Sequence, residues 1–240
     1  MSKGAESPVR SEKSAEALVG RREAGKAERR ARIIHAARDL IRETGNAGLS
    51  MRALAVRAGV SLATPYNLFG SKRAIVLAVL DDWREFLDRF AHLRSTDPLE
   101  RLFAAVEMAV EFYVTDPPFY KTLWAAMFDA SDDVRRQIFN NKRDEFWRGL
   151  IRDAAAAGVV APGVNVELVF RALDRSFGAA MLDWVMGEVE SDVLAPTIGH
   201  SYALILKGAA SADWRGPLEA RLRDSQARIE RSQRPAAAGG

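Results

Sequence analysis

The chain has 240 residues, of which 48% are hydrophobic and 28% charged, so it is long enough to bury a core in one large or two modest domains. No apolar run approaches the roughly 20 residues that a membrane span needs, and residues 1–25 lack the apolar stretch of a secretory signal, so a cytoplasmic protein without membrane contact is expected. The absence of cysteine from the sequence excludes disulfides, thiolate metal sites and cysteine nucleophiles.

The net charge of +3 is unevenly distributed along the chain. Residues 1–73 contain 15 Lys and Arg against 7 Asp and Glu, a net charge of +8, whereas residues 74–240 carry −5. A basic segment joined to an acidic body is expected where one end of a protein faces a polyanion. The distribution indicates nucleic acid as a partner, which the motif in residues 49–72 narrows to double-stranded DNA.

The chain begins with a charged segment that lacks apolar periodicity, which predicts a disordered basic tail over residues 1–28. Whether this tail touches DNA around Arg21, Arg22 and Lys26 stays open. From Ile33 onward, apolar residues recur at helical spacing.

The helical period continues through most of the chain, and no alternating strand pattern interrupts it. We expect a DNA-binding domain over 29–75, a helix over 72–90, a helical ligand-binding and dimerisation domain over 76–214 and a flexible tail over 215–240. Further helices are expected over 98–114, 118–128, 132–157, 166–188 and 193–212. The predicted fold class is therefore all-α, with a three-helix domain followed by a larger helical bundle.

Residues 49–72 carry the most informative motif. Ser50 is a good N-cap for a helix that stops at Gly59, and Ser61 is a good cap for the helix that follows. Gly59 permits a sharp turn, and the small side chain of Ala55 permits two helices to approach closely. This is the pattern of a helix-turn-helix, in which the second helix enters the major groove of DNA.

Over about Arg32 to Trp83 the sequence resembles the TetR family of bacterial regulators. The match rests on residues 55–61 and 66–72, where several fixed residues recur at fixed offsets. The resemblance implies a homodimer, an N-terminal DNA-reading domain and a helical domain that holds an inducer. It also implies a transcription regulator, usually a repressor that a small molecule releases from a palindromic operator.

The resemblance assigns DNA contacts to the helix before the turn, the exposed face of the helix after it and the start of the next helix. Tyr66 and Lys72 match positions that clamp phosphates, and Asn67 is suited to pair with adenine in the major groove. The complete predicted set is Ser50, Arg52, Ser61, Leu62, Ala63, Thr64, Tyr66, Asn67 and Lys72.

Two residues depart from the family pattern. Pro65 stands where a buried aliphatic residue is more common, and with Ser61 as the cap it occupies the fourth helical position, where it removes only the first intrahelical hydrogen bond. Leu68 stands where a Tyr or His commonly touches the DNA backbone. One phosphate contact is therefore expected to be weakened.

In the helical domain, aromatic and Met side chains belong to the core by default, but some are predicted to line a pocket for a small, largely apolar ligand. The predicted pocket residues are Tyr113, Tyr120, Trp124, Met127, Trp147 and Phe177. Two apolar stripes predict a four-helix interface with a second copy of the chain, the alternative being that they complete the core of the monomer. These stripes contain Phe170, Leu173, Phe177, Met181, Trp184, Ile198, Tyr202, Ile205 and Ala209.

His35, His92 and His200 lack the i, i+4 histidine pairing of a metal site, so no metal and no cofactor is predicted. The sequence offers no nucleophile–base pair and no phosphate-binding glycine loop, so an enzyme is not expected. Three other interpretations stay open. They are a DNA-binding architectural protein without ligand control, a transcriptional activator and a helical protein–protein adaptor.

Overall fold

The computed structural model describes residues 8–80, 84–129 and 141–233. In these ranges the chain forms α-helices joined by loops, and the one extended pairing is an isolated bridge between Val160 and Ala210. The all-α prediction is confirmed. None of the helices in these ranges has the length and apolar character that a membrane crossing requires. The chain divides into two compact units, residues 1–79 and 80–240.

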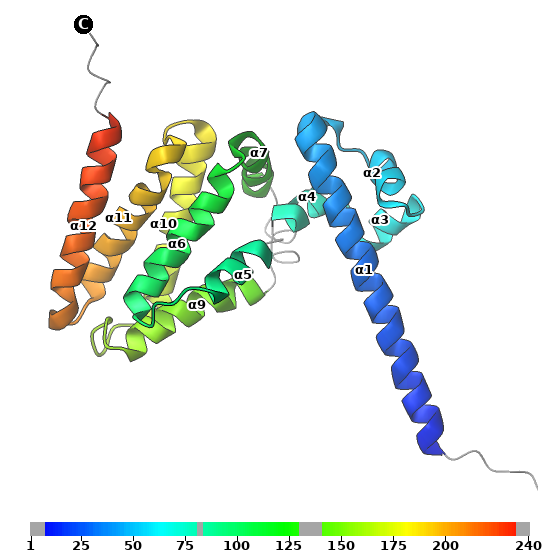
Figure 1. The fold of residues 1–240 in the computed structure, drawn as a ribbon, viewed down its shortest axis with the longest axis horizontal. Helices are drawn as coiled ribbons and strands as arrows, with labels where there is room; N and C mark the ends of the chain where they lie inside the picture. Colours follow the sequence, from blue (N-terminus) through cyan, green and yellow to red (C-terminus); the bar gives the residue numbers. More distant parts are fainter. Residues whose placement is uncertain (1–7, 81–83, 130–140, 234–240) are drawn as a thin grey trace, which may run out of the picture. The chain divides into compact units, whose positions relative to one another are not determined.

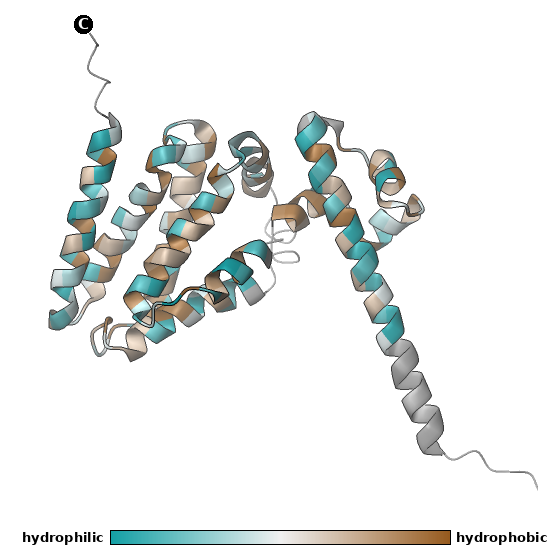
Figure 2. Ribbon diagram, in the orientation of Figure 1, coloured by the Kyte–Doolittle hydropathy of each residue, from teal (hydrophilic) through white to brown (hydrophobic). Residues whose placement is uncertain are grey.

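In the first unit, a long helix packs against two short ones (Figure 1). Its described helices are α1 (Pro8–Gly48), α2 (Met51–Ala58), α3 (Ala63–Phe69) and α4 (Lys72–Leu80). One face of α1 and the inner face of α2 supply a core of almost fully buried side chains. These are Ile33, Ala36, Ala37, Leu40, Ile41, Leu54, Ala55 and Ala58. α4 is apolar along most of its length (Figure 2), and Ala74 to Leu80 are all buried.

The prediction of a disordered tail over 1–28 is wrong from Pro8 onward, because α1 begins there. Residues 1–7 lie outside the described residues. The segment is rich in Ala, Glu, Lys and Arg, which have high helix propensity, and a helix that is already nucleated extends at little cost. Low apolar content therefore did not prevent this segment from forming a helix.

The turn between α2 and α3 forms as predicted. The Ser50 hydroxyl oxygen accepts a hydrogen bond from the Ala53 N–H, 3.1 Å away, and caps α2. Gly59 ends α2 with a φ of +63°, a left-handed conformation that residues with a Cβ rarely adopt. The Val60 N–H then returns to the carbonyl oxygen of Ala55 at 3.0 Å, which closes the helix end.

α3 begins at Ala63, two residues after the predicted cap, and it lacks a side-chain cap. Pro65 is therefore its third residue and not the fourth, as predicted. The first N–H groups of a helix have no intrahelical acceptor, so the proline removes no hydrogen bond from α3. The Pro65 ring is buried, which replaces the aliphatic residue that is more common there.

The second unit is a helical bundle in which α6 and α10 pack against several neighbours. Its described helices are α5 (Arg84–Ala91), α6 (Pro98–Val114), α7 (Pro117–Phe128), α9 (Asn141–Ala156), α10 (Val166–Met186), α11 (Ser191–Ala209) and α12 (Ala212–Gln233). The predicted helix over 72–90 corresponds to α4 and α5, and residues 81–83 between them lie outside the described residues. The first part of the predicted helix 132–157 also lies outside them.

The expected flexible tail over 215–240 is wrong up to Gln233, because α12 packs along α11. Leu218 is completely buried. Arg221 forms an ion pair with Glu100 of α6, and Arg228 forms another with Glu107 at 3.0 Å. The charged residues of α12 thus form the solvent face of an amphipathic helix and its links to α6.

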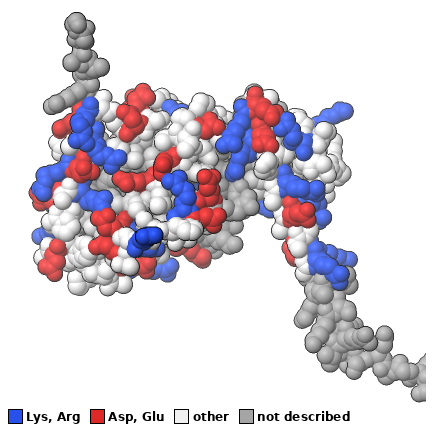
Figure 3. Space-filling view, in the orientation of Figure 1, with Lys and Arg blue, Asp and Glu red and all other residues white. Residues whose placement is uncertain are grey.

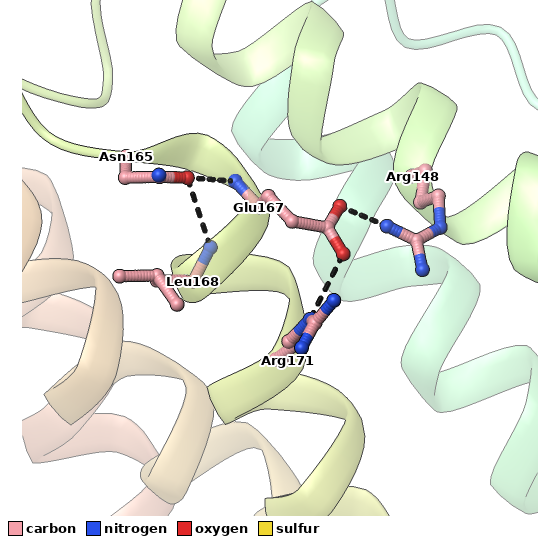
Figure 4. Close-up of polar contacts among 5 residues, drawn as sticks. All are labelled: Arg148, Asn165, Glu167, Leu168 and Arg171. Atoms are coloured by element: carbon pink, nitrogen blue, oxygen red, sulfur yellow. Dashed lines mark hydrogen bonds and ion pairs between the residues drawn. The ribbon is translucent and has the colours of Figure 1, made fainter.

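A polar cluster joins α9 to the start of α10 (Figure 4). The Glu167 carboxylate accepts hydrogen bonds from Arg148 of α9 and from Arg171 one turn along α10. The Asn165 side chain caps α10 by accepting from the N–H groups of Glu167 and Leu168 at 3.0 and 3.3 Å. The two arginines lower the pKa of Glu167, so the carboxylate stays ionised and holds the two helices in register.

Candidate nucleic-acid interface and ligand cavity

α3 presents a largely exposed face to solvent. Leu62 is 53% exposed and Tyr66 is 51% exposed, and Ala63 and Asn67 are exposed beside them. Pro65 lies on the opposite, buried side. The four exposed residues were all predicted to meet DNA, and the structure brings them together on one helix.

The remaining predicted DNA residues lie at the start of α2, at the turn, in α3 and at the start of α4. They are Ser50, Arg52, Ser61, Thr64 and Lys72. Ser50 and Arg52 are exposed at the start of α2, and Lys72 is the first residue of α4. The Ser61 and Thr64 hydroxyl oxygens lie 2.9 Å apart and share a hydrogen bond. One hydrogen bond of the two hydroxyl groups is therefore made within the chain.

An ion pair holds α2 against α1. Arg57 donates two hydrogen bonds to the Glu43 carboxylate, from Nη1 to Oε1 at 2.9 Å and from Nη2 to Oε2 at 2.7 Å. The hydrogen bonds from Arg57 lower the pKa of Glu43, and those same bonds raise the pKa of Arg57. A two-point contact of this kind restricts rotation of α2 about its own axis.

Sequence reasoning missed a contact of Arg30 with the end of α3. Arg30 lies on α1, and its Nη1 donates to the carbonyl oxygen of Leu68 at 3.3 Å. Its guanidinium group lies over the Phe69 ring, 4.2 Å from the centroid. No local sequence signal marks a pair 38 residues apart, because the pair depends on how α1 packs against the helix-turn-helix.

The second unit contains a cavity of about 220 Å³ between α7, α9, α10 and α11. Aromatic and aliphatic side chains form most of its wall, and a few polar side chains join them. The lining residues are Trp124, Met127, Arg143, Asp144, Trp147, Ile151, Phe170, Leu173, Asp174, Phe177, Gly178 and Tyr202. A mainly apolar wall with few polar groups is the usual composition of a small-molecule site.

One wall of the cavity carries a buried hydrogen-bond donor. Trp124 is 4% exposed, and its indole Nε1 has no hydrogen-bond partner within the described part of the chain. Arg143 lies beside it, with its guanidinium carbon 5.8 Å from a Trp124 ring centroid, and its Nη2 donates to the Tyr113 hydroxyl at 2.9 Å. A buried N–H without an acceptor costs free energy relative to one that is hydrogen-bonded.

Two ionisable side chains of the cavity have perturbed pKa values. Burial and the neighbouring charge of Asp144 raise the pKa of Asp174 above its usual range, against the opposing effect of Arg143, Arg148 and Arg175. Burial, followed by the charge of Asp174, raises the pKa of the Tyr202 hydroxyl strongly. Tyr202 is therefore neutral at physiological pH and is available as a hydrogen-bonding group.

Four of the six predicted pocket residues, Trp124, Met127, Trp147 and Phe177, line this cavity, whereas Tyr113 and Tyr120 do not. The two tyrosines are buried next to it, and Tyr113 meets the Trp124 ring edge to face at 5.6 Å between centroids.

The polar lining residues were missed, although the sequence carries a signal for one of them. Asp174 falls inside the apolar stripe formed by Phe170, Leu173, Phe177 and Gly178, at i, i+3, i+7 and i+8. A carboxylate in a core stripe marks a functional-site candidate.

The two stripes predicted to meet a second copy of the chain face inward instead. Most of their residues are buried within a single chain, and Met181, Trp184 and Ile198 are completely inaccessible. The set is Phe170, Leu173, Phe177, Met181, Trp184, Ile198 and Tyr202, with Ile205 and Ala209 half-buried. Because α7, α9 and α12 add to the bundle, the apolar faces of α10 and α11 are used inside the monomer.

The outer face of α10 nevertheless carries exposed apolar side chains. Leu168, Leu182 and Met186 are exposed, Met186 by 69%, and Leu204 of α11 is 53% exposed. The α10 residues recur at i, i+14 and i+18, which places them on one side of the helix. We call these four residues the outer apolar face. Within the described ranges, no group of three or more His, Asp or Glu is arranged to hold a metal ion.

Comparison with known sequences finds relatives over most of the chain. The sequence profile of the family described as "Bacterial regulatory proteins, tetR family" matches residues 33–79. The HTH-type transcriptional regulator UidR of Escherichia coli K12 is 30% identical over 176 residues, which cover 69% of this chain and 84% of UidR. The HTH-type transcriptional repressor KstR2 of Mycolicibacterium smegmatis is 24% identical over 188 residues, covering 76% of this chain and 90% of KstR2.

Solved structures with the same fold include regulators bound to quite different ligands. Thermus thermophilus FadR, a TetR family repressor in complex with lauroyl-CoA, matches with a TM-score of 0.61 at 20% identity, over 88% of this chain and 99% of FadR. RolR in complex with resorcinol matches with a TM-score of 0.60 at 17% identity, over 84% of this chain and 96% of RolR.

Proposed function

Because this chain belongs to the TetR family of bacterial regulatory proteins, we propose that it is a ligand-controlled transcriptional repressor. It binds a pseudo-palindromic operator as a homodimer, and a small molecule in the cavity of the second unit releases it. The cavity, about 220 Å³ with an unpartnered buried Trp124 N–H, carries the proposal of ligand control.

The exposed face of α3 supports the DNA-binding part of the proposal. In a homodimer the two copies of α3 enter successive major grooves, about 34–36 Å apart. Tyr66 and Lys72 hold phosphates, while Asn67 and the apolar Leu62 and Ala63 meet the edges of bases.

The size of the cavity favours a small effector over a long acyl thioester. A cavity of roughly 150 Å³ in a protein core is enough for benzene, and drug-sized ligands occupy about 300–1,000 Å³. At about 220 Å³, the cavity suits a compound of one or two rings, similar in size to the resorcinol of RolR. Lauroyl-CoA, the ligand of FadR, is far larger.

The outer apolar face supports the homodimer. Exposed Leu168, Leu182, Met186 and Leu204 lie on α10 and α11, and a second copy related by a twofold axis would bury them in a four-helix contact. A ligand then acts by favouring one separation of the two α3 helices over another, and a coupling of about 1–3 kcal/mol is typical of such control.

The test is selection of bound DNA from a random pool with the purified protein at near-physiological salt, followed by titration of the selected DNA with candidate effectors. An enriched inverted repeat that is released by one-ring or two-ring aromatic compounds supports the proposal. An inverted repeat that no compound releases would contradict ligand control.

A second candidate is an architectural DNA-binding protein without ligand control. The few polar side chains on the exposed face of α3 favour it, because Leu62 and Ala63 offer no hydrogen bonds to bases. Recovery of bound DNA without a shared sequence would support this candidate. An activator would differ in its effect on a promoter, which a reporter assay with and without the protein measures.

A further inference from the structure

α1 extends N-terminally beyond the core of the first unit. Its described buried residues begin at Ile33, whereas the residues from Gly20 to Arg29 are exposed apart from Gly25, which is half-buried. At 1.5 Å per residue, this segment adds roughly 15 Å of helix past the core. Figure 1 shows α1 continuing past α2 and α3. We call residues 20–29 the arm.

The core face of α1 becomes a basic face in the arm. Ile33, Ala37 and Leu40 are buried at helical spacing, and the same stripe continues toward the N-terminus as Arg29, Lys26 and Arg22. The steps between successive members are three or four residues throughout, so all six lie on one side of the helix. Figure 3 shows Lys and Arg side chains gathered on this part of α1.

Arg30 establishes which way this side of α1 faces. It lies three residues before Ile33, at the edge of the same stripe, and it contacts the carbonyl oxygen of Leu68 and the ring of Phe69, at the end of α3. The basic face of the arm therefore points to the side of α1 on which α3 lies. The arm also contains two acidic residues, Glu23 and Glu28. Glu28 precedes Ile33 by five residues, which places it on the side of α1 away from the stripe.

From these observations we infer that Arg22, Lys26 and Arg29 form a second phosphate-binding element, which contacts the DNA backbone beside the segment that α3 reads. The inference rests on the proposed DNA-binding function. The span from Arg22 to Arg29 is roughly 10 Å, the length of about three base-pair steps of one strand. Contacts of this kind add affinity that depends on salt and not on sequence.

The test compares two double variants of the full chain that remove the same charge from two different faces of α1. Arg22→Gln with Lys26→Gln changes the basic face. Arg21→Gln with Arg32→Gln changes a neighbouring face, about 100° round the helix. Glutamine keeps a high helix propensity, so α1 should remain helical, which circular dichroism checks. The readout is the slope of log Kd against log salt concentration on the selected DNA.

Each lost phosphate contact lowers the magnitude of this slope by about 0.9, so the slope of the first variant should be smaller by about two. The same variant should also protect a shorter stretch of DNA from hydroxyl radicals at the flanks of the site. The second variant should change the slope by much less. Equal slopes for both variants and the unmodified chain would overturn the inference. A change of oligomeric state in the first variant, measured by sedimentation, would overturn it as well. Failure of the unmodified chain to bind DNA would instead contradict the proposed function.

Discussion

The guanidinium group of Arg30 lies 4.2 Å from the centroid of the Phe69 ring and so joins the middle of α1 to the end of α3. The hydrogen bond from Arg30 to the carbonyl oxygen of Leu68 adds a second contact at the same point. α3 has seven residues, too few to be stable by itself, so contacts such as these hold it in place.

Replacing Arg30→Met should therefore weaken DNA binding without removing a DNA contact. Methionine keeps the apolar stem but loses the cation and its hydrogen bond, and we expect a loss of about 1 kcal/mol in the stability of the first unit. Thermal unfolding and DNA affinity both measure the effect. Arg32→Met, an exposed residue of the same helix, is the control. Equal effects of the two substitutions would show that the contact with Phe69 is unimportant.

Tyr66→Phe should weaken binding to all DNA sequences alike. Tyr66 is 51% exposed on α3, and removal of its hydroxyl takes away the one neutral phosphate contact that we propose for it, while the ring remains. Asn67→Ala serves as the contrast, because loss of the proposed bidentate base contact should cost about 1–3 kcal/mol on the preferred site and less elsewhere. Binding curves on the selected operator and on shuffled DNA separate the two effects. Loss of sequence preference in Tyr66→Phe alone would reverse the roles given to the two residues.

Local chemistry made part of this structure predictable. The cap at Ser50 and the left-handed Gly59 follow from residue type alone, and the predicted bounds of α6 match because Asp97 caps it and Pro98 begins it. These features depend on contacts within four residues. The predictions missed the N-terminal half of α1, which lacks apolar periodicity, and all of α12.

Other features depend on which elements meet in space, and periodicity does not specify this. The stripe containing Met181 and Trp184 was correctly found on one face of a helix, but sequence does not say whether the neighbour belongs to the same chain or to a second copy. α7, α9 and α12 cover the stripes of α10 and α11, and the exposed Leu182 and Met186 lie on the other face of α10. For the same reason only four of the twelve residues that line the cavity were predicted, since its polar residues come from several helices.

The outer apolar face leads to a prediction about assembly. The double substitution Leu182→Glu with Met186→Glu should convert a dimer into a monomer, because it places two carboxylates in an apolar contact. Both side chains are exposed in the single chain, so its fold should be unaffected. Val56→Glu, at a position 77% exposed on α2, is the control for added surface charge. Analytical ultracentrifugation measures the outcome, and a dimer that survives the double substitution would exclude this face.

Asp174 should make stability depend on pH in an unusual direction. Its folded pKa is raised above the ordinary 3.8, mainly by burial and by Asp144, so the folded state binds its proton more tightly than the unfolded state does. The stabilisation from that proton is fully present below pH 3.8 and is lost as pH rises through the raised value.

Asp174→Asn should consequently raise the melting temperature at pH 7, and the gain should shrink as the pH falls toward 4. Arg143, Arg148 and Arg175 oppose the shift, so the gain is expected to be modest. Asp183→Asn, on the exposed side of the same helix, controls for the change in net charge. A gain of the same size in both variants at every pH would show that only net charge matters.

Trp124→Phe should have opposite effects on the protein with and without its ligand. In the free protein the substitution removes a buried N–H that lacks an acceptor within the described part of the chain, so the melting temperature should stay the same or rise. In the complex it removes a donor to the ligand, so affinity for the best effector of an aromatic panel should fall by about tenfold, the equivalent of one hydrogen bond of roughly 1.4 kcal/mol. Trp147→Phe, which trims another ring of the same cavity, separates loss of apolar contact from loss of the donor. A lower melting temperature with unchanged affinity would mean that Trp124 only fills the core, whereas a higher melting temperature with weaker binding identifies its N–H as the group that the effector satisfies.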